Sequence, residues 1–137
     1  MSLDRERYQG LAGFRLALRR FLAASEAISK GAGVTQQQYQ ALLAIKAAEG
    51  AHMTMSDLAE QLLLTHHAAV QMVDRLAKAG LAERQPSERD RRQVRLGLTP
   101  AGDKVVENLA ARHLAEMLRQ APRLRRSLSQ LTRLGEG

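Results

Sequence analysis

The pattern of apolar and polar residues predicts two amphipathic helices near the start of the chain. Between residues 8 and 29 apolar side chains recur at steps of three and four, as Leu11, Phe14, Leu18, Phe21 and Leu22. That spacing is the period of a helix with one buried face, and the glycine-containing run at 30–33 ends it. Thr35 and Gln38 have the spacing of a capping box, so a second helix is expected to begin there and to end at Gly50.

Two short helices with almost nothing between them are predicted next. Residues 52–55 are too few for a helix and suit a small edge strand, after which Ser56 is expected to cap a third helix of about two turns. Thr65 can cap a fourth helix, and Gly80 suits the position after its last turn. Its inward face would consist of Ala69, Met72, Val73 and Leu76. Such a pair forms a helix-turn-helix, whose second helix can enter a DNA major groove.

The apolar period shortens to two residues after the fourth helix. From Val94 to Leu98 apolar side chains alternate with Arg95 and Gly97, which is typical of a strand. Residues 81–85 can pair with this strand in the antiparallel sense. The connecting segment 86–92 is too polar to be buried, so it is expected to form an exposed hairpin tip, or wing.

A long helix is predicted after the hairpin, with Thr99 as its N-cap, Pro100 as its first residue and Pro122 as its end. The tail then continues the amphipathic pattern with Leu124, Leu128 and Leu131. Helices at both chain ends thus carry apolar faces that a small lobe cannot bury, which predicts a homodimer. The expected fold class is mainly α with a small β-hairpin, comprising a winged helix-turn-helix lobe and a helical dimerisation lobe built from both chain ends.

Composition adds charge to this picture and excludes some chemistry. The 137 residues include 21 Lys plus Arg against 14 Asp plus Glu, a formal net charge of +7 that favours a polyanionic partner. The absence of cysteine excludes disulfides, thiolate zinc sites and thiol catalysis. No apolar run approaches the roughly 20 residues of a membrane span and the N-terminus does not resemble a signal peptide, so a cytoplasmic protein is expected.

Two groups of side chains are candidates for DNA contacts. The outward face of the fourth helix carries His66, His67, Val70, Gln71 and Arg75. Glutamine can bond adenine through two hydrogen bonds, and valine can touch a thymine methyl group. The hairpin carries Arg84, Ser87, Arg89, Asp90, Arg91, Arg92 and Arg95. Arginine suits phosphates or a narrow minor groove, and Asp90 is expected to pair with a neighbouring arginine. Each group also has a simpler explanation when it is considered alone. The helix residues could form an ordinary solvent-exposed face, and the hairpin residues could serve only to keep the hairpin soluble.

Five short segments between Met55 and Gly102 occur in a characteristic order and spacing. They are Ser56-Asp57-Leu58-Ala59, Val73-Asp74-Arg75-Leu76, Gly80-Leu81-Ala82-Glu83-Arg84, Asp90-Arg91-Arg92 and Leu98-Thr99-Pro100-Ala101-Gly102. This set resembles the core of the MarR (multiple antibiotic resistance regulator) family. The segment from Val34 to Tyr39 also resembles the family's entry to its second helix, so the likeness covers nearly the whole chain.

The resemblance implies a DNA-binding lobe at 35–102 and dimerisation helices at 4–34 and 103–134. It also implies a ligand-responsive repressor that binds a pseudo-palindromic operator as a homodimer, with a small effector that is often aromatic or anionic. Recognition-helix roles would go to Thr65, His66, His67, Val70 and Gln71, a supporting role to Arg75, and wing roles to Asp90 and Arg92. Val70 occupies a position where many members of the family have a hydroxyl side chain, and the adjacent histidines at 66 and 67 are an uncommon pair there. The base preference of other members therefore cannot be transferred to this chain.

Other classes of function fit the sequence less well. His52, His66, His67 and His113 lack the spacing of a metal site, so no metal or cofactor is expected. The sequence contains no nucleophile and base, no pair of carboxylates and no phosphate-binding loop at the spacing that catalysis requires. An enzyme is therefore not expected. Five residues could line an effector crevice, namely Phe14, Arg15, Leu18, Tyr39 and Leu43. Each of them is explained more simply as a core or flanking residue of an amphipathic helix. The remaining alternative is a winged-helix protein-interaction module without specific DNA binding. Salt-dependent binding to duplex DNA would discriminate the two, because counterion release gives a steep slope only when phosphates are neutralised.

Overall fold

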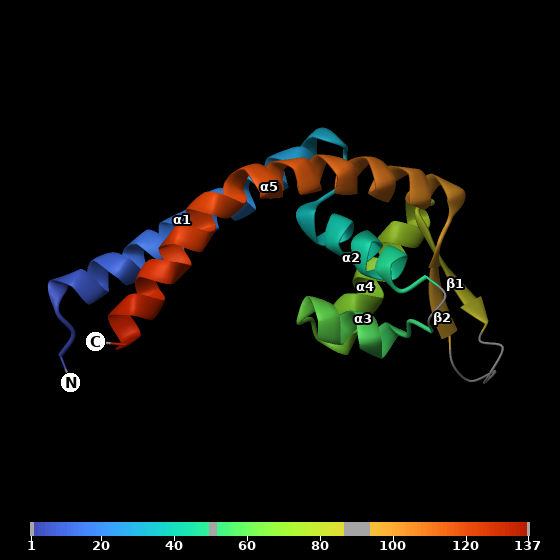
Figure 1. The fold of residues 1–137 in the computed structure, drawn as a ribbon. Coiled ribbons are helices and arrows are strands. Elements are labelled where there is room, and N and C mark those ends of the chain that lie inside the picture. The colour runs from blue at the N-terminus through green and yellow to red at the C-terminus, as the bar shows by residue number, and fades with distance from the viewer. Residues whose placement is uncertain (1, 50–51, 87–93, 137) are drawn as a thin grey trace. The chain divides into compact units, whose positions relative to one another are not determined.

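The computed structural model describes residues 2–49, 52–86 and 94–136, and within them the predicted fold class is confirmed (Figure 1). The elements are α1 (Arg5–Gly31), α2 (Gln36–Ala47), α3 (Met55–Leu62), α4 (His66–Lys78), β1 (Ala82–Pro86), β2 (Val94–Leu98) and α5 (Pro100–Glu136). They form two compact units: a helical unit of residues 1–28 and 111–137, and a winged-helix unit of residues 29–110. No helix among the described residues is long and apolar enough to cross a membrane.

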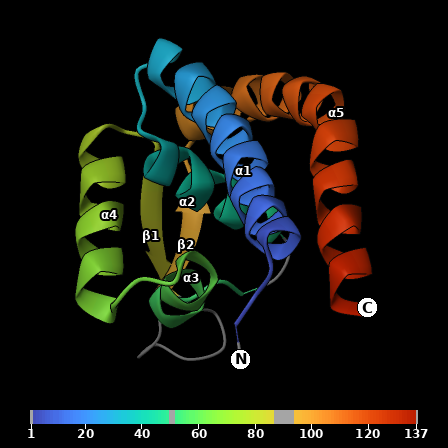
Figure 2. The same ribbon diagram turned by 90° about the vertical axis from the view of Figure 1, so that its left-hand side faces the viewer.

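The winged-helix unit is organised around a core to which each of its helical segments contributes. Leu42 of α2, Leu58 of α3, Leu76 of α4 and Leu109 of α5 are fully buried. The predicted inward face of α4 is confirmed, because Ala69, Met72, Val73 and Leu76 all lie in the core. Burying each leucine stabilises the unit by about 1.5–3 kcal/mol relative to exposure. In Figure 2 α4 and β1 lie side by side, in agreement with the contacts between them.

Local capping explains where most helices of this unit begin. Thr35 and Gln38 form the predicted capping box on α2, and Thr65 caps α4. The prediction that Ser56 caps α3 is wrong. Thr54 is the N-cap: its hydroxyl accepts from the Asp57 N–H at 3.1 Å, and the Asp57 carboxylate accepts from the Thr54 N–H at 2.9 Å. This reciprocal pair satisfies two backbone donors, which a single serine cap would not.

The hairpin pairs β1 with β2 in antiparallel register, with Ala82 opposite Leu98 and Pro86 opposite Val94. The first strand thus begins one residue later than predicted. No strand is assigned to the described residues 52–55, contrary to the expected edge strand. A single backbone hydrogen bond of 2.9 Å, from Leu96 N–H to the Met53 carbonyl, nevertheless attaches this segment to β2.

The last helix runs through Pro122 instead of ending there, so the prediction of two terminal helices is wrong. Proline cannot donate a backbone hydrogen bond and its ring crowds the preceding turn, at a cost of about 3 kcal/mol in a helix interior. The side chains before and after it continue to pack: His113 is buried, and Leu124 and Leu131 are partly buried, within the helical unit. The cost of proline is therefore offset by packing on both sides of it.

In the helical unit α1 and the second half of α5 run antiparallel. The buried His113 imidazole Nε2 lies 3.1 Å from the Ser25 carbonyl oxygen, and the Arg7 guanidinium donates to the Leu134 carbonyl at 3.1 Å. A Cβ on Gly10 would come within 2.5 Å of a Leu134 methyl carbon, so the Leu134 side chain packs directly against Gly10. The early part of α1 therefore pairs with the end of α5.

A close backbone contact joins the base of the hairpin to the start of α5. The Thr99 hydroxyl donates to the Gly80 carbonyl at 2.6 Å, and the Thr99 N–H donates to the Leu81 carbonyl at 3.2 Å. A Cβ on Gly102 would overlap the Leu81 carbonyl oxygen, so only glycine fits without a backbone shift. Gly80 itself has φ +74°, the left-handed conformation expected after the end of α4.

We expect Gly102→Ala to destabilise the protein by about 1–3 kcal/mol, because the added methyl group must displace the Leu81 carbonyl. Gly13→Ala is the matched control: Gly13 lies within α1 with no atom within 4 Å of a Cβ, so alanine should stabilise by roughly 0.5–1 kcal/mol. Urea unfolding of both variants measures these changes. Equal stability of Gly102→Ala and wild type would contradict the close contact.

The capping box of α3 predicts a pH dependence of stability. The hydrogen bonds from the Thr54 backbone and hydroxyl lower the pKa of Asp57. Because the folded-state pKa is depressed, the carboxylate contributes stability that is fully present above its unfolded pKa of about 3.9 and is lost as pH falls through the folded value. At pH 7 wild type should be more stable than Asp57→Asn by about 1 kcal/mol, and this difference should shrink as pH falls through the folded-state pKa of Asp57. Urea unfolding between pH 2.5 and pH 7 measures this difference in stability, with Glu60→Gln as the control. A difference that does not change with pH would contradict the role of the Asp57 carboxylate.

Candidate nucleic-acid interface

A three-residue turn between α3 and α4 holds the second helix in a fixed direction. Leu63 adopts the left-handed conformation at φ 54°, and the Leu64 N–H donates to the Ala59 carbonyl at 2.9 Å. The Thr65 hydroxyl then accepts from the Ala68 N–H at 3.1 Å and begins α4. A leucine at positive φ carries strain of order 1 kcal/mol, and its side chain is 92% exposed, so the turn is not stabilised by burying it.

The outward face of α4 brings together the side chains that the sequence predicted there. His66, His67, Gln71 and Arg75 are exposed, and Val70 is partly buried between them and the core face. The first turn of α4 contains no acidic residue, so the positive end of the helix dipole is not neutralised. This end of the helix therefore combines exposed hydrogen-bonding groups with a field that attracts anions.

Asp74 and Arg84 add an interaction that the sequence interpretation missed. The Arg84 guanidinium on β1 pairs with the Asp74 carboxylate on α4 at 2.6 Å. The pair links the outward side of α4 to the hairpin and neutralises the carboxylate on that face. Arg84 is thus engaged within the unit, whereas the sequence interpretation placed it among the DNA contacts. The exposed Lys78, in the last turn of α4, is a cation on this helix that the sequence interpretation did not consider.

Further along the hairpin, polar side chains bond across the two strands. Arg95 of β2 donates to the Gln85 side-chain oxygen at 2.8 Å and 3.2 Å, and Gln85 donates to Glu83 at 2.8 Å. A Cβ on Gly97 would come within 2.7 Å of the Gln85 amide, so glycine leaves room for this group. The predicted wing residues lie outside the described residues, namely Ser87, Arg89, Asp90, Arg91 and Arg92.

Charge is distributed unevenly between the two units. The winged-helix unit has ten Lys plus Arg against nine Asp plus Glu, a net charge of +1. The helical unit has eleven Arg against five Asp plus Glu, a net charge of +6. The overall net charge of +7 therefore says little about the candidate interface, whose electrostatics depend on local groups.

The histidines do not assemble into a metal site. His66 and His67 are exposed on α4, His113 is buried in the helical unit, and the buried Nε2 of His52 makes no hydrogen bond. Over residues 2–49, 52–86 and 94–136, no group of three or more His, Asp or Glu side chains could hold a metal ion.

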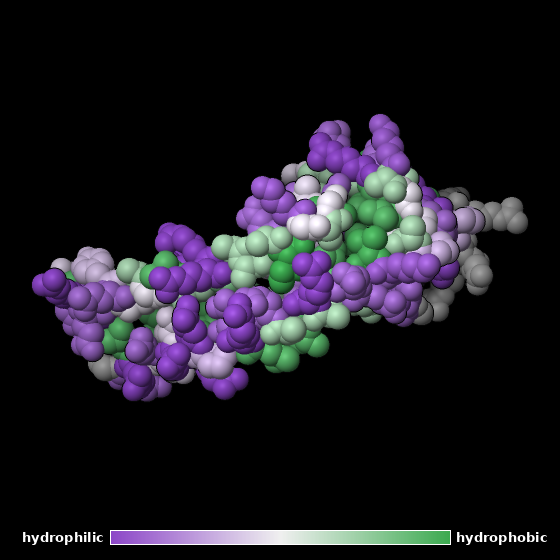
Figure 3. All heavy atoms as spheres, turned by 90° about the horizontal axis from the view of Figure 1, so that it is seen from above, coloured by the Kyte–Doolittle hydropathy of each residue, from purple (hydrophilic) through white to green (hydrophobic). Residues whose placement is uncertain are grey.

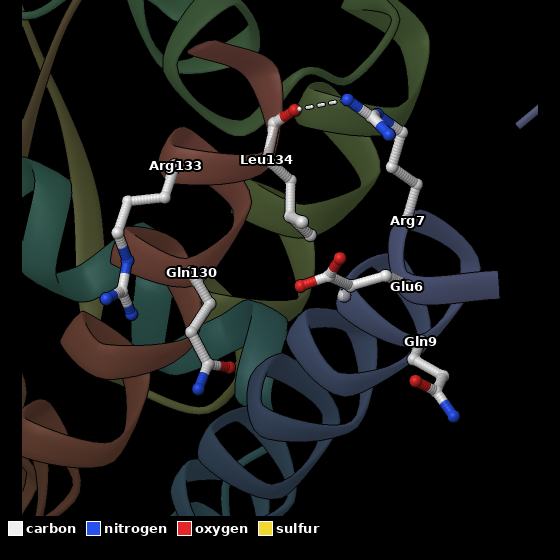
Figure 4. A pocket seen from close by; sticks show the side chains of 7 residues that line it. Glu6, Arg7, Gln9, Gln130, Arg133 and Leu134 are labelled. Carbon is white, nitrogen blue, oxygen red and sulfur yellow. Dashed lines mark hydrogen bonds between the residues drawn. The ribbon is translucent and has the colours of Figure 1, made fainter. Parts of the chain in front are cut away.

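The open hollows of the helical unit include two large ones. One, of about 680 Å³, is lined by Leu11, Ala12, Phe14, Arg15, Arg19 and Leu131, and so includes two of the five residues that were weighed for an effector crevice. The other, of about 630 Å³, is lined by residues that include Glu6 and Arg7 of α1 and Gln130 and Arg133 of α5 (Figure 4). Of the other three residues weighed for the crevice, Leu18 is half-buried, Tyr39 is buried in the other unit, and Leu43 is exposed. The first hollow combines apolar walls with two guanidinium groups, whereas the second has charges of both signs.

Comparison with known proteins finds similarity to one family. Residues 32–93 match the sequence model of the MarR family, and no curated protein matches the chain. AbsC, a MarR family transcriptional regulator from Streptomyces coelicolor, is similar in structure, with a TM-score of 0.79 and 25% identity over 88% of this chain and 81% of AbsC. YusO protein from Bacillus subtilis has a TM-score of 0.67 and 25% identity over 95% of this chain and 99% of YusO.

A structure with DNA shares the same fold. A mutant of S. aureus MepR bound to an oligodeoxyribonucleotide has a TM-score of 0.67 and 21% identity, over 90% of this chain and 93% of MepR. The matched segment contains α2, α3, α4 and β1, which together build the candidate interface. The sequence match over residues 32–93 and the structural likeness agree: the chain is similar to the MarR family in this segment and has a winged-helix fold like that of the regulator AbsC.

Proposed function

We propose that the protein is a sequence-specific DNA-binding transcriptional regulator. The observation that carries the proposal is α4 itself, whose apolar face is wholly buried while His67 and Gln71, one turn apart, are exposed. A helix held in this way can enter a major groove without loss of its packing. The MepR structure, which contains an oligodeoxyribonucleotide, and the regulator AbsC support this function for the fold.

Separate roles follow for the helix and the wing. Gln71 and the histidines at 66 and 67 would contact base edges, Val70 a thymine methyl group, and Arg75 the adjacent backbone. The Thr65-capped end of α4 would approach a phosphate, since no carboxylate repels it there. In the wing, Arg89, Arg91 and Arg92 would contact phosphates or the minor groove together with Ser87, and Asp90 would pair with an arginine.

The helical unit would make the protein a homodimer. Leu114, Leu118 and Leu128 of α5 are 60%, 65% and 53% exposed and lie on one side of the helix, which leaves an apolar stripe facing solvent in a single chain. Burying such a stripe against a second copy removes it from water. Two symmetry-related α4 helices would then read a pseudo-palindromic operator, and operator binding near a promoter would repress transcription.

The hollow lined by Phe14, Arg15 and Arg19 supports response to a small aromatic or anionic effector. Its apolar wall suits a ring, and the two guanidinium groups suit a carboxylate. An effector bound there would contact only the helical unit. It would alter DNA affinity to the extent that it binds the DNA-competent state more or less tightly than other states.

Substitution of Gln71 tests base recognition. Gln71→Ala should weaken binding to the selected operator by about 1–3 kcal/mol and leave binding to random duplex nearly unchanged, because a base contact carries the sequence information. Gln40→Ala, on the exposed side of α2, is the matched control and should bind both duplexes like wild type. Fluorescence anisotropy across a salt series measures both affinities. If Gln71→Ala weakened binding to both duplexes equally, Gln71 would not be a base-reading residue.

Substitution of Leu118 tests the dimer. Leu118→Glu places a charge on the exposed apolar stripe of α5 and should convert a dimer into monomers at micromolar concentration. Leu43→Glu, at a leucine that is 39% exposed in the winged-helix unit, serves as the control and should remain dimeric. Sedimentation velocity measures the oligomeric state. A monomeric wild-type protein, or a Leu118→Glu dimer as stable as wild type, would exclude this interface.

A further inference from the structure

The second half of α5 carries an unusual concentration of arginine. Six of the eleven arginines of the helical unit lie between residues 112 and 133, and the unit contains no lysine. Arginine differs from lysine in presenting a planar fork of donors that matches phosphate oxygens. Since the winged-helix unit is nearly neutral, most of the excess positive charge of this protein lies in the helical unit.

Five of these six arginines follow one line along the helix. At 3.6 residues per turn these five fall within an arc of about 80° around the helix axis, over a length of about 32 Å. They are Arg112, Arg119, Arg123, Arg126 and Arg133. We call this set the arginine ridge. All five side chains are exposed. Arg125 points about 100° away from its neighbour Arg126 and does not belong to the ridge. Hydrophilic side chains cover most of the face of the helical unit visible in Figure 3.

The ridge is little neutralised by other groups. Arg119 pairs with Glu116 at 2.7 Å, which raises the pKa of Arg119 and lowers that of Glu116. Among the residues that the structure describes, the other four ridge arginines make no ion pair or side-chain hydrogen bond. Five arginines and one glutamate therefore give the ridge a local charge of +4.

The geometry of the ridge limits what it can bind. The exposed stripe of Leu114, Leu118 and Leu128 lies about 140° around α5 from the centre of the ridge, so a membrane surface cannot engage both at once. The only exposed aliphatic side chain among the described residues of the arc is the methyl group of Ala115, which is too small to anchor a protein partner, and the arc contains no exposed aromatic side chain to stack on an unpaired base. A straight row of guanidinium groups instead matches the regular phosphates of a duplex, which carries one charge per about 1.7 Å of its axis.

We propose that the arginine ridge of α5 is a second, sequence-independent contact surface for the phosphate backbone of duplex DNA. It acts in addition to the base-reading surface of α4 that the proposed function describes, and it does not require α4 to recognise a sequence. The apolar stripe remains free to face a second copy of the chain, because it lies on another side of the helix.

Neutralising the ridge tests this surface in the full-length protein. The triple variant Arg123→Gln, Arg126→Gln, Arg133→Gln should flatten the log–log salt dependence of binding to a random-sequence duplex by about two to three units, and Arg126→Gln alone by about one unit. Arg125→Gln removes the same charge from the neighbouring position off the ridge and should leave the slope within about 0.3 units of wild type, since it loses no phosphate contact. Circular dichroism and sedimentation verify that all variants keep their helix content and oligomeric state.

The outcomes separate this proposal from the proposed function. A flattened slope in the ridge variants, with no change in Arg125→Gln, supports the ridge even if no preferred operator exists. Wild-type slopes in the ridge variants overturn it, even if Gln71→Ala loses operator affinity as expected. Equal flattening by Arg125→Gln and Arg126→Gln also overturns it, because net charge would then suffice. Loss of binding only to phosphatidylserine vesicles, with duplex binding intact, would assign the ridge to membranes and overturn the proposal.

Discussion

The carbonyl oxygen of Leu81 occupies the space that a side chain on Gly102 would need, and this close approach determines how three elements meet. The end of α4, the base of the hairpin and the start of α5 converge on it. Thr99 completes the junction with its two hydrogen bonds to Gly80 and Leu81. Because packed backbone cannot deform without cost, the direction of the hairpin relative to α4 is fixed at this point. The Asp74 to Arg84 ion pair adds a second attachment further along.

That constraint explains how a small unit can offer two contact surfaces at once. α4 is held by its buried face, by the cap at Thr65 and by the junction at its other end. A rigid helix loses little conformational entropy when it enters a groove, so more of the contact energy appears as affinity. In the proposed function, general attraction of DNA by this unit depends on local groups, namely the end of α4 and the wing arginines. The arginine ridge of α5, in the other unit, is proposed to add to that attraction.

Much of the fold could be predicted from the sequence, because its signals are local. The capping pair of Thr35 with Gln38, the cap at Thr65, the glycine after α4 and the buried stripe of α4 each depend on a few neighbouring residues. Thr54 and Asp57 have the same spacing as Thr35 and Gln38, but an interpretation of residues 52–55 as a strand obscured it. The rule that proline ends a helix fails at Pro122, because local rules cannot weigh the cost of proline against packing before and after it.

The features that the sequence did not reveal depend on tertiary structure. Nothing local indicates that Arg84 pairs with Asp74, or that Leu63 adopts a left-handed turn that most leucines avoid. Likewise, total charge carries no information on location, so the concentration of arginine in the helical unit emerged only once the units were defined. The α4 side chains were predicted more reliably, because helical period alone separates Gln71 and His67 from the buried face.

The central claim is that α4 reads DNA sequence, and selection of bound duplexes from a random pool by the full-length protein tests it most directly. The account predicts enrichment of one inverted repeat, with half-sites about one helical turn apart, centre to centre, as two symmetry-related α4 helices require. Enrichment should disappear at the contacted positions when the selection is repeated with Gln71→Ala. A bound pool with no enriched motif, in spite of tight salt-dependent binding, would contradict the claim.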